Sequence, residues 1–341
     1  MVFLFVLEFL LSGGILMEDI SKEEILSTIN NNIKEYDLMY VKRFVNTFRE
    51  ELLKIFNLFN KVPQEAYIVS MAHSMCDVQA EVLHSVSMID MELYKELYAI
   101  YSGNDDKRLF WHIADEENPA FNDDKCMVVD DEFRIMQVTF DYNAMDYARL
   151  AHESGHILSV NRTNTNRFLL AEIESTFLEK LVIRDLVKRG VLTDYDNEMF
   201  RLNDFAALAP YITNVVSQTD VLNMVRYPVE AEDLVRVHNY YEGKPNDVYI
   251  YKAILDLTQP DSLDLLHYTL RYIIGEVVSY YMVKQYESGD VEIVERYKEF
   301  LKNSNDETVN EVCKKLIGMD FNQAISNYVK DIALEMEVIK R

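Results

Sequence analysis

Residues 152–156 read His-Glu-Ser-Gly-His, and this H-E-x-x-H pattern constrains the chain more than any other segment. Residues four positions apart lie on one face of an α-helix, so His152 and His156 can bind one metal ion together. Glu153 lies beside the pair, where it can accept a proton from a metal-bound water. Zinc suits the pattern because it binds imidazole nitrogen and tolerates an open fourth position for water. The segment therefore predicts a helix that carries one zinc ion per chain.

A catalytic zinc site of this kind needs a third protein ligand, which usually comes from the next helix. Residues 161–166 are polar and typical of a turn, and a second helix is expected from about residue 167 to residue 189, with Gly190 ending it. Its first turns carry Glu172 and Glu174. Spacing alone favours neither glutamate over the other; we choose Glu172 as the third ligand.

At this point the sequence resembles the zinc oligopeptidases of the oligoendopeptidase F and thimet oligopeptidase type. Residues 152–156 are similar to the H-E-x-G-H motif of that family, and 171–179, Ala-Glu-Ile-Glu-Ser-Thr-Phe-Leu-Glu, are similar to its A-E-V-A-S-T-F-N-E segment. The resemblance implies that Glu172 is the third zinc ligand. Glu174 departs from the family, which has a small residue there. Gly155 matches the family glycine, whose missing Cβ lets a neighbouring backbone approach closely.

A second segment, Tyr-Ile-Ile-Gly-Glu-Val at 272–277, resembles the family segment in which a tyrosine faces the zinc. The resemblance implies that Tyr272 donates a hydrogen bond to the oxyanion of the tetrahedral intermediate. Tyr268, one helical turn earlier, is a second candidate. The family has a histidine about ten residues before the tyrosine, but this chain has Ser262 there. His267 either replaces that histidine or is a packing residue.

The mechanism that the resemblance implies uses zinc to acidify a water molecule and polarise the scissile carbonyl. Glu153 then accepts the water proton and passes it to the leaving amine. A zinc-bound histidine also needs an acceptor for its other ring nitrogen. Asp146 is a candidate for that role, although a capping interaction with Asn143 at the start of the helix is favoured.

Residues 134–140 alternate in polarity well enough to predict a β-strand. In the family that this chain resembles, such a strand borders the cleft and pairs with extended substrate backbone. An ordinary sheet edge is an equally good interpretation. The resemblance covers about residues 125–341, and its dense matches lie at 138–180 and 268–277.

The rest of the pattern is helical, with apolar residues three and four apart over 20–60 and a second helical pattern over 63–101. Only nine glycines and six prolines occur, which favours long helices. We therefore expect a mainly α fold, a helical zincin-like metallopeptidase with a small β-sheet beside the zinc-binding helix. The expected division is an N-terminal helical part at 17–105 and a catalytic part at 106–341.

The formal net charge of −24 is spread along the chain, which argues against nucleic acid or an anionic membrane as a partner. The three cysteines lie far apart and form no paired framework, which favours a reducing compartment. These observations predict a cytoplasmic enzyme.

The first sixteen residues form an apolar segment that is too short to span a bilayer and has no Lys or Arg near its start. We expect Met17 to be the true start and 1–16 to be a non-native extension. A weak signal peptide is the alternative.

Taken together, the sequence predicts a zinc metalloendopeptidase that hydrolyses short peptides. A helical metallocarboxypeptidase would use the same ligands but would recognise a free C-terminus. A peptide-binding protein with weak or lost activity on the same fold is the third alternative. The substrate, the cleavage preference and the oligomeric state are left open by the sequence.

Overall fold

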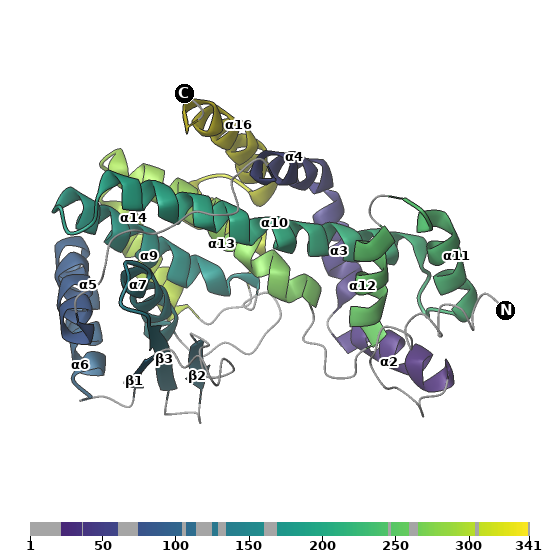
Figure 1. Cartoon of the computed structure of the whole chain (residues 1–341), viewed down its shortest axis with the longest axis horizontal. Coiled ribbons are helices and arrows are strands. Elements are labelled where there is room, and N and C mark those ends of the chain that lie inside the picture. Colours follow the sequence, from purple (N-terminus) through teal and green to yellow (C-terminus); the bar gives the residue numbers. More distant parts are fainter. Residues whose placement is uncertain are drawn as a thin grey trace. The chain divides into compact units, whose positions relative to one another are not determined.

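The computed structural model shows a mainly α-helical protein with one small β-sheet (Figure 1). Its described residues are 22–35, 37–60, 74–103, 107–113, 125–128, 134–159, 169–244, 247–258, 265–303 and 307–339. The predicted turn at 161–166, Ser262 and the segment 1–16 lie outside them. Among the described residues, no helix is both long and apolar enough to cross a membrane.

The chain forms two compact units, each built from separate segments. The first unit comprises 1–60, 208–270 and 329–341, and the second comprises 61–207 and 271–328. Three helices contribute residues to both units: α10 (Asp194–Met224), α13 (Leu265–Glu287) and α16 (Phe321–Ile339). The linear division at residue 105 that the sequence suggests stays a prediction.

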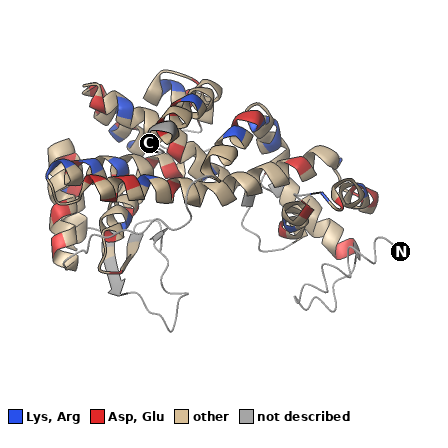
Figure 2. Ribbon diagram, turned by 45° about the horizontal axis from the view of Figure 1, so that its top comes forward, with Lys and Arg blue, Asp and Glu red and all other residues tan. Residues whose placement is uncertain are grey.

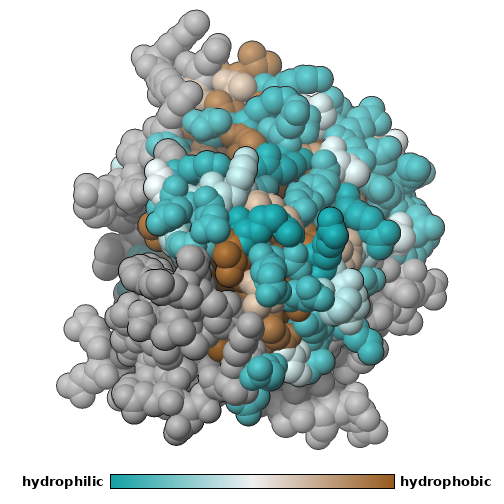
Figure 3. Space-filling view, turned by 90° about the vertical axis from the view of Figure 1, so that its right-hand side faces the viewer, coloured by the Kyte–Doolittle hydropathy of each residue, from teal (hydrophilic) through white to brown (hydrophobic). Residues whose placement is uncertain are grey.

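All the described secondary-structure elements of the first unit are helices. Its remaining elements are α2 (Lys22–Glu35), α3 (Leu38–Asn46), α4 (Arg49–Phe59), α11 (Ala231–Tyr241) and α12 (Asp247–Thr258). Long-range polar contacts join them: the Asn32 amide donates to the Leu257 carbonyl at 2.9 Å, and Arg49 makes two hydrogen bonds to Asp220. On the face that carries α11 and α12, the described residues are mostly hydrophilic, with separate hydrophobic areas among them (Figure 3).

The second unit contains both the sheet and the H-E-x-x-H helix. Its remaining elements are α5 (Met75–Ile89), α6 (Met91–Tyr101), β1 (Lys107–Ile113), β2 (Lys125–Val128), β3 (Arg134–Phe140), α7 (Met145–Leu158), α9 (Ala171–Lys188), α14 (Glu292–Lys302) and α15 (Val309–Ile317). Acidic and basic residues are interspersed along the helices (Figure 2). Side-chain caps begin several helices; at α6, for example, Asp90 accepts from the backbone N–H groups of Glu92 and Leu93.

The strand predicted at 134–140 is confirmed, but it is the central strand of the sheet. The strand order is β1-β3-β2, with β1 parallel to β3 along its whole length and β2 antiparallel to residues 134–137. The backbone of 134–137 is therefore paired on both sides. Both expectations for this strand, a substrate-binding edge and an ordinary edge, are wrong over these residues.

Helix α7 packs against this sheet, as the sequence predicts for the H-E-x-x-H helix. The Ser154 hydroxyl lies 3.9 Å from the sulfur of Met136 on β3 and donates to the Leu150 carbonyl at 2.5 Å. It also lies 2.7 Å from the hydroxyl of Tyr101 on α6. Ser154 itself is fully buried. One hydroxyl thus joins α7 to both the sheet and α6.

Helix α7 also contacts α9, and Gly155 makes this contact possible. A Cβ built on Gly155 would lie 2.4 Å from the Glu174 carbonyl oxygen and 2.5 Å from the Cα of Ser175. No side chain fits against backbone at such distances, so the two helices touch through their main chains. The close approach predicted for this glycine is confirmed.

Other helices of the second unit fix α9 in turn. Lys180 on α9 lies 2.9 Å from Glu276 on α13 and 3.4 Å from Asp204 on α10. Tyr328 donates to the other oxygen of Glu276 at 3.0 Å. Burial raises the pKa of Asp204 to about 7, although Lys180 opposes the shift. Tyr297 on α14 donates to the Glu174 carbonyl at 2.5 Å.

The sign of a stability change at Gly155 tests this packing. Helix propensity alone predicts that Gly155→Ala raises the free energy of unfolding by about 1 kcal/mol. Overpacking against the backbone of α9 predicts a decrease of about 1–3 kcal/mol instead, and we expect the decrease. Urea unfolding followed by circular dichroism measures it; a stabilised variant would contradict the close contact of α7 and α9.

Candidate metal centre

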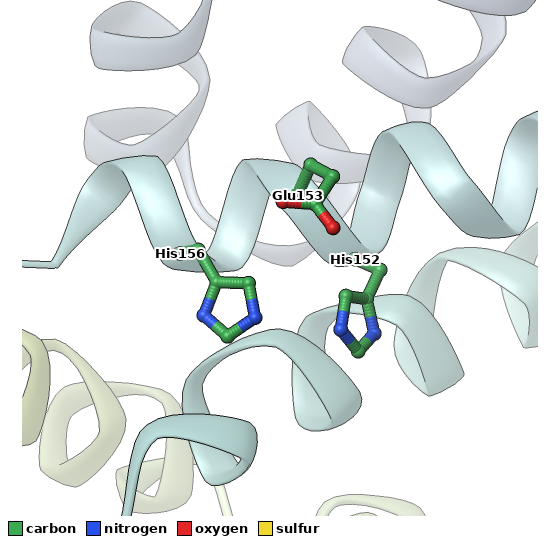
Figure 4. Close-up of side chains that lie close together, drawn as sticks. All are labelled: His152, Glu153 and His156. Atoms are coloured by element: carbon green, nitrogen blue, oxygen red, sulfur yellow. The ribbon is translucent and has the colours of Figure 1, made fainter. Parts of the chain in front are cut away.

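The two histidines of the H-E-x-x-H pattern leave α7 on the same side, and Glu153 projects between them along the helix (Figure 4). Their ring centroids lie 5.0 Å apart. One donor atom from each of His152, Glu153 and His156 can be chosen so that all three lie within 4.8 Å of one another. Glu153 is buried, whereas the side chains of His152 and His156 are partly exposed. The protein therefore holds the cluster in place, and a small ligand can still reach the imidazoles.

Asp146 stabilises the start of α7. Its carboxylate accepts from the backbone N–H groups of Asp141 at 3.0 Å and Asn143 at 3.1 Å, while the Asn143 side chain accepts from Met145. Arg149 forms an ion pair with the same carboxylate at 3.3 Å. The favoured capping role of Asp146 is therefore the one observed.

Glu172, in the first turn of α9, approaches both imidazoles with one oxygen. Its Oε2 lies 3.2 Å from Nε2 of His152 and 3.7 Å from Nε2 of His156. Ligand atoms around a tetrahedral zinc ion, with bonds of 2.0–2.1 Å, lie about 3.3 Å apart. The Glu172 oxygen lies near that spacing from both imidazole nitrogens, and two imidazoles with one carboxylate are a donor set that suits zinc chemically.

Two further glutamates of α9 face the outer nitrogens of the imidazoles. Nδ1 of His152 lies 2.8 Å from Oε2 of Glu179, a hydrogen bond in which the imidazole donates. Nδ1 of His156 lies 3.8 Å from Oε2 of Glu174. A carboxylate at this position fixes the tautomer that leaves Nε2 available to a metal. Helix α9 thus supplies Glu179 as the hydrogen-bond acceptor that orients His152. The sequence had offered Asp146 as a candidate for this role.

Electrostatics at the site favour a positive charge between these groups. Burial lowers the pKa of His152, but the hydrogen bonds that its imidazole donates to Glu172 and Glu179 outweigh burial and raise the pKa well above the usual value. Burial raises the pKa of Glu172, but the charges and hydrogen bonds of the two imidazoles reverse that and hold it well below the usual range. Glu172 is only 1% exposed, so its carboxylate is a buried anion that requires cationic partners.

Arg271 on α13 is one such cationic partner. Its Nε lies 3.0 Å from Oε1 of Glu172, and its Nη2 donates to the hydroxyl oxygen of Tyr272 at 3.0 Å. This contact links the predicted tyrosine to the proposed metal ligand. Tyr268 lies one turn earlier on α13, in the part of the helix that belongs to the first unit, and its catalytic role stays a prediction.

His267, also in the first-unit part of α13, is a buried residue. Its side chain is only 2% exposed, and burial lowers its pKa to about 4. These features favour the packing role over the substrate-binding role, the two alternatives left open by the sequence.

The chain was compared with protein families, curated proteins and solved structures. No protein-family model matches the chain, and no curated protein matches it. Two solved structures do match. One, provisionally described as a peptidase from Chlamydophila abortus, gives a TM-score of 0.54 at 14% identity and covers 96% of this chain. The other, provisionally described as an oligoendopeptidase F from Bacillus anthracis str. Ames, gives 0.53 at 12% identity and covers 94%.

These similarities extend over the whole fold, but the chain spans only 57% of each of those proteins. At such low identity they show a shared fold. The mainly helical class predicted from the sequence is confirmed, and the resemblance to oligoendopeptidases is supported at the level of the fold.

The buried state of His267 predicts a defined pH dependence of stability. As the pH falls from 7 to 5, the unfolded chain takes up a proton near pH 6.5 while the folded chain resists until about pH 4. His267 therefore lowers the free energy of unfolding by about 2 kcal/mol over this range. His267→Gln should remove that part of the pH dependence in urea unfolding measured at both pH values.

The control for this measurement is His84→Gln, which removes an exposed imidazole on α5. The control should keep the wild-type pH dependence. An unchanged dependence in His267→Gln as well would contradict the buried neutral state of His267.

Proposed function

We propose that the protein is a zinc metallopeptidase that hydrolyses internal bonds of short peptides. His152, His156 and Glu172 are the proposed zinc ligands, with one ion per chain. When bound, zinc supplies a Lewis acid that polarises the scissile carbonyl and acidifies a water molecule. The observation that carries the proposal is the approach of one Glu172 oxygen to both imidazoles, at 3.2 and 3.7 Å.

Glu153 is the proposed general base. It follows a proposed ligand directly in sequence and is 95% buried, within the same cluster of donor atoms as the two histidines. There it accepts a proton from the attacking water and delivers it to the nitrogen of the leaving amine. Such proton transfer by a positioned side chain contributes about 10²–10⁴-fold to the rate.

Tyr272 is the proposed donor to the developing oxyanion, with Tyr268 as the second candidate. The contact of Tyr272 with Arg271, which itself contacts Glu172, supports Tyr272 over Tyr268. Because Arg271 donates to the phenolic oxygen, the hydroxyl hydrogen of Tyr272 points away from the guanidinium. Loss of one oxyanion donor costs about 3–4 kcal/mol of transition-state stabilisation.

The substrates are proposed from the same chemistry and from the fold. The structural neighbours are described as peptidases, which supports peptides as the substrate class. The net charge of −24 argues against nucleic acid and anionic membranes as partners. A reducing cytoplasmic location is proposed from the scattered cysteines alone. A metallocarboxypeptidase and a weakly active peptide-binding protein remain the alternatives for the test below.

Glu153→Gln tests the assignment of the base. The substitution removes the proton acceptor and leaves the three proposed ligands in place, so zinc content should stay near one ion per chain. We expect hydrolysis of end-blocked, internally quenched peptides by the wild type, and a loss of kcat/KM of about 10²–10⁴-fold in the variant. Metal analysis of the same samples measures the zinc content.

Glu232→Gln, at an exposed position of α11, is the matched control and should retain wild-type activity. Release of only the last residue, from peptides with a free C-terminus, would indicate the carboxypeptidase. Zinc binding with no cleavage of any peptide by the wild type would indicate the binding protein.

A further inference from the structure

We propose that Arg271 is a positioning residue for the metal ligand Glu172, one that makes this carboxylate bind through a single oxygen. The proposal rests on the proposed zinc site, in which Glu172 is a ligand. The two oxygens of Glu172 have different partners: Oε2 lies 3.2 Å from Nε2 of His152, whereas Oε1 lies 3.0 Å from Nε of Arg271. One oxygen thus faces the metal position and the other faces the guanidinium.

The geometry of α13 explains why Arg271 can reach the carboxylate. Gly275 lies four residues after Arg271 and therefore on the same face of the helix. A Cβ built on Gly275 would lie only 2.5 Å from the Cβ of Glu172 and 2.9 Å from its carbonyl carbon. The backbone of α13 thus lies directly against Glu172, and Arg271, one turn earlier, extends along its side chain.

Charge and the number of contacting nitrogens both favour an arginine here. Glu172 is 1% exposed, and a buried carboxylate needs compensation by a cation. A lysine could supply the charge. However, Arg271 also donates from Nη2 to the Tyr272 hydroxyl at 3.0 Å, so two nitrogens of one planar guanidinium contact the carboxylate and the tyrosine, whereas lysine has a single nitrogen. Arg271 thereby joins the third ligand to the proposed oxyanion donor.

The contact between Arg271 and Glu172 bears on the coordination number of a bound metal. A carboxylate can bind a metal through one oxygen or through both. With Oε1 engaged by Arg271, Glu172 occupies one position, and a catalytic zinc site keeps its fourth position for water or substrate. Without Arg271, Oε1 is released and can occupy a further position. Partners that orient a ligand in this way typically change metal affinity by about 10–100-fold.

The test compares the wild type with Arg271→Gln and Arg271→Lys. The control is Arg189→Gln, which removes another partly buried arginine of the second unit. The side chains of Arg271 and Arg189 are similarly exposed, 18% and 22%, and Arg189 likewise binds a carboxylate, that of Asp185 at 2.7 Å. Two properties are measured: the zinc Kd by competition with a chromophoric chelator, and the visible absorption of the Co²⁺-substituted protein, which reports coordination number.

We expect Arg271→Gln to weaken zinc binding by about 10–100-fold and to shift the cobalt spectrum towards the weaker absorption of a higher coordination number. Arg271→Lys should recover part of the affinity through its charge but should keep the altered spectrum, because lysine lacks the fork. Arg189→Gln should keep the wild-type affinity and spectrum, whatever its thermal stability.

Wild-type affinity and spectrum in a folded Arg271→Gln would overturn the proposal, and so would changes of equal size in Arg189→Gln. If Arg271→Gln does not fold, the spectrum of Arg271→Lys decides: a wild-type spectrum overturns the proposal. The peptidase proposal fails separately, since a wild type that binds zinc without cleaving peptides leaves both metal measurements intact. A wild type that binds no zinc overturns both.

Discussion

The main-chain contact between α7 and α9 is the constraint on which the rest of the site depends. The two histidines lie on α7 and the carboxylate that meets them lies on α9, so the donor atoms converge only if the helices touch closely. Gly155 permits this because a Cβ there would lie 2.4 Å from the Glu174 carbonyl oxygen. Gly275 permits the equivalent approach of α13 to Glu172. Two residues without side chains thus set the dimensions of the proposed metal centre.

Helix α9 has a second role, because it also orients the His152 imidazole on α7. Glu179 accepts from His152 at 2.8 Å, and the neighbouring Lys180 holds α9 to α13 through Glu276 at 2.9 Å. The proposed ligand Glu172, the hydrogen-bond acceptor Glu179 and the ion-paired Lys180 all lie within about two turns of α9. Because such acceptors fix the tautomer of a ligand histidine, a displacement of α9 would disturb the ligand geometry and the imidazole orientation together.

Local sequence signals predicted much of this arrangement. The H-E-x-x-H helix, the strand at 134–140 and the end of α9 near residue 189 follow from helical spacing, alternation and a terminating glycine. The pairing of β3 on both sides does not follow, because the sequence shows that a strand exists but not which strands flank it. Arg271 was missed for a similar reason: Gly275 is a sequence signal of close approach, but it does not show that the backbone it meets is that of Glu172. The interleaved units likewise depend on long-range contacts.

The proposed site requires residues from α7 and α9 to bind a single metal ion. Diffraction from crystals grown with zinc, recorded on both sides of the zinc absorption edge, tests it most directly. We expect one anomalous peak per chain, about 2.0–2.2 Å from Nε2 of His152, Nε2 of His156 and an oxygen of Glu172. A peak bound by other residues, or no peak in crystals saturated with zinc, would contradict it.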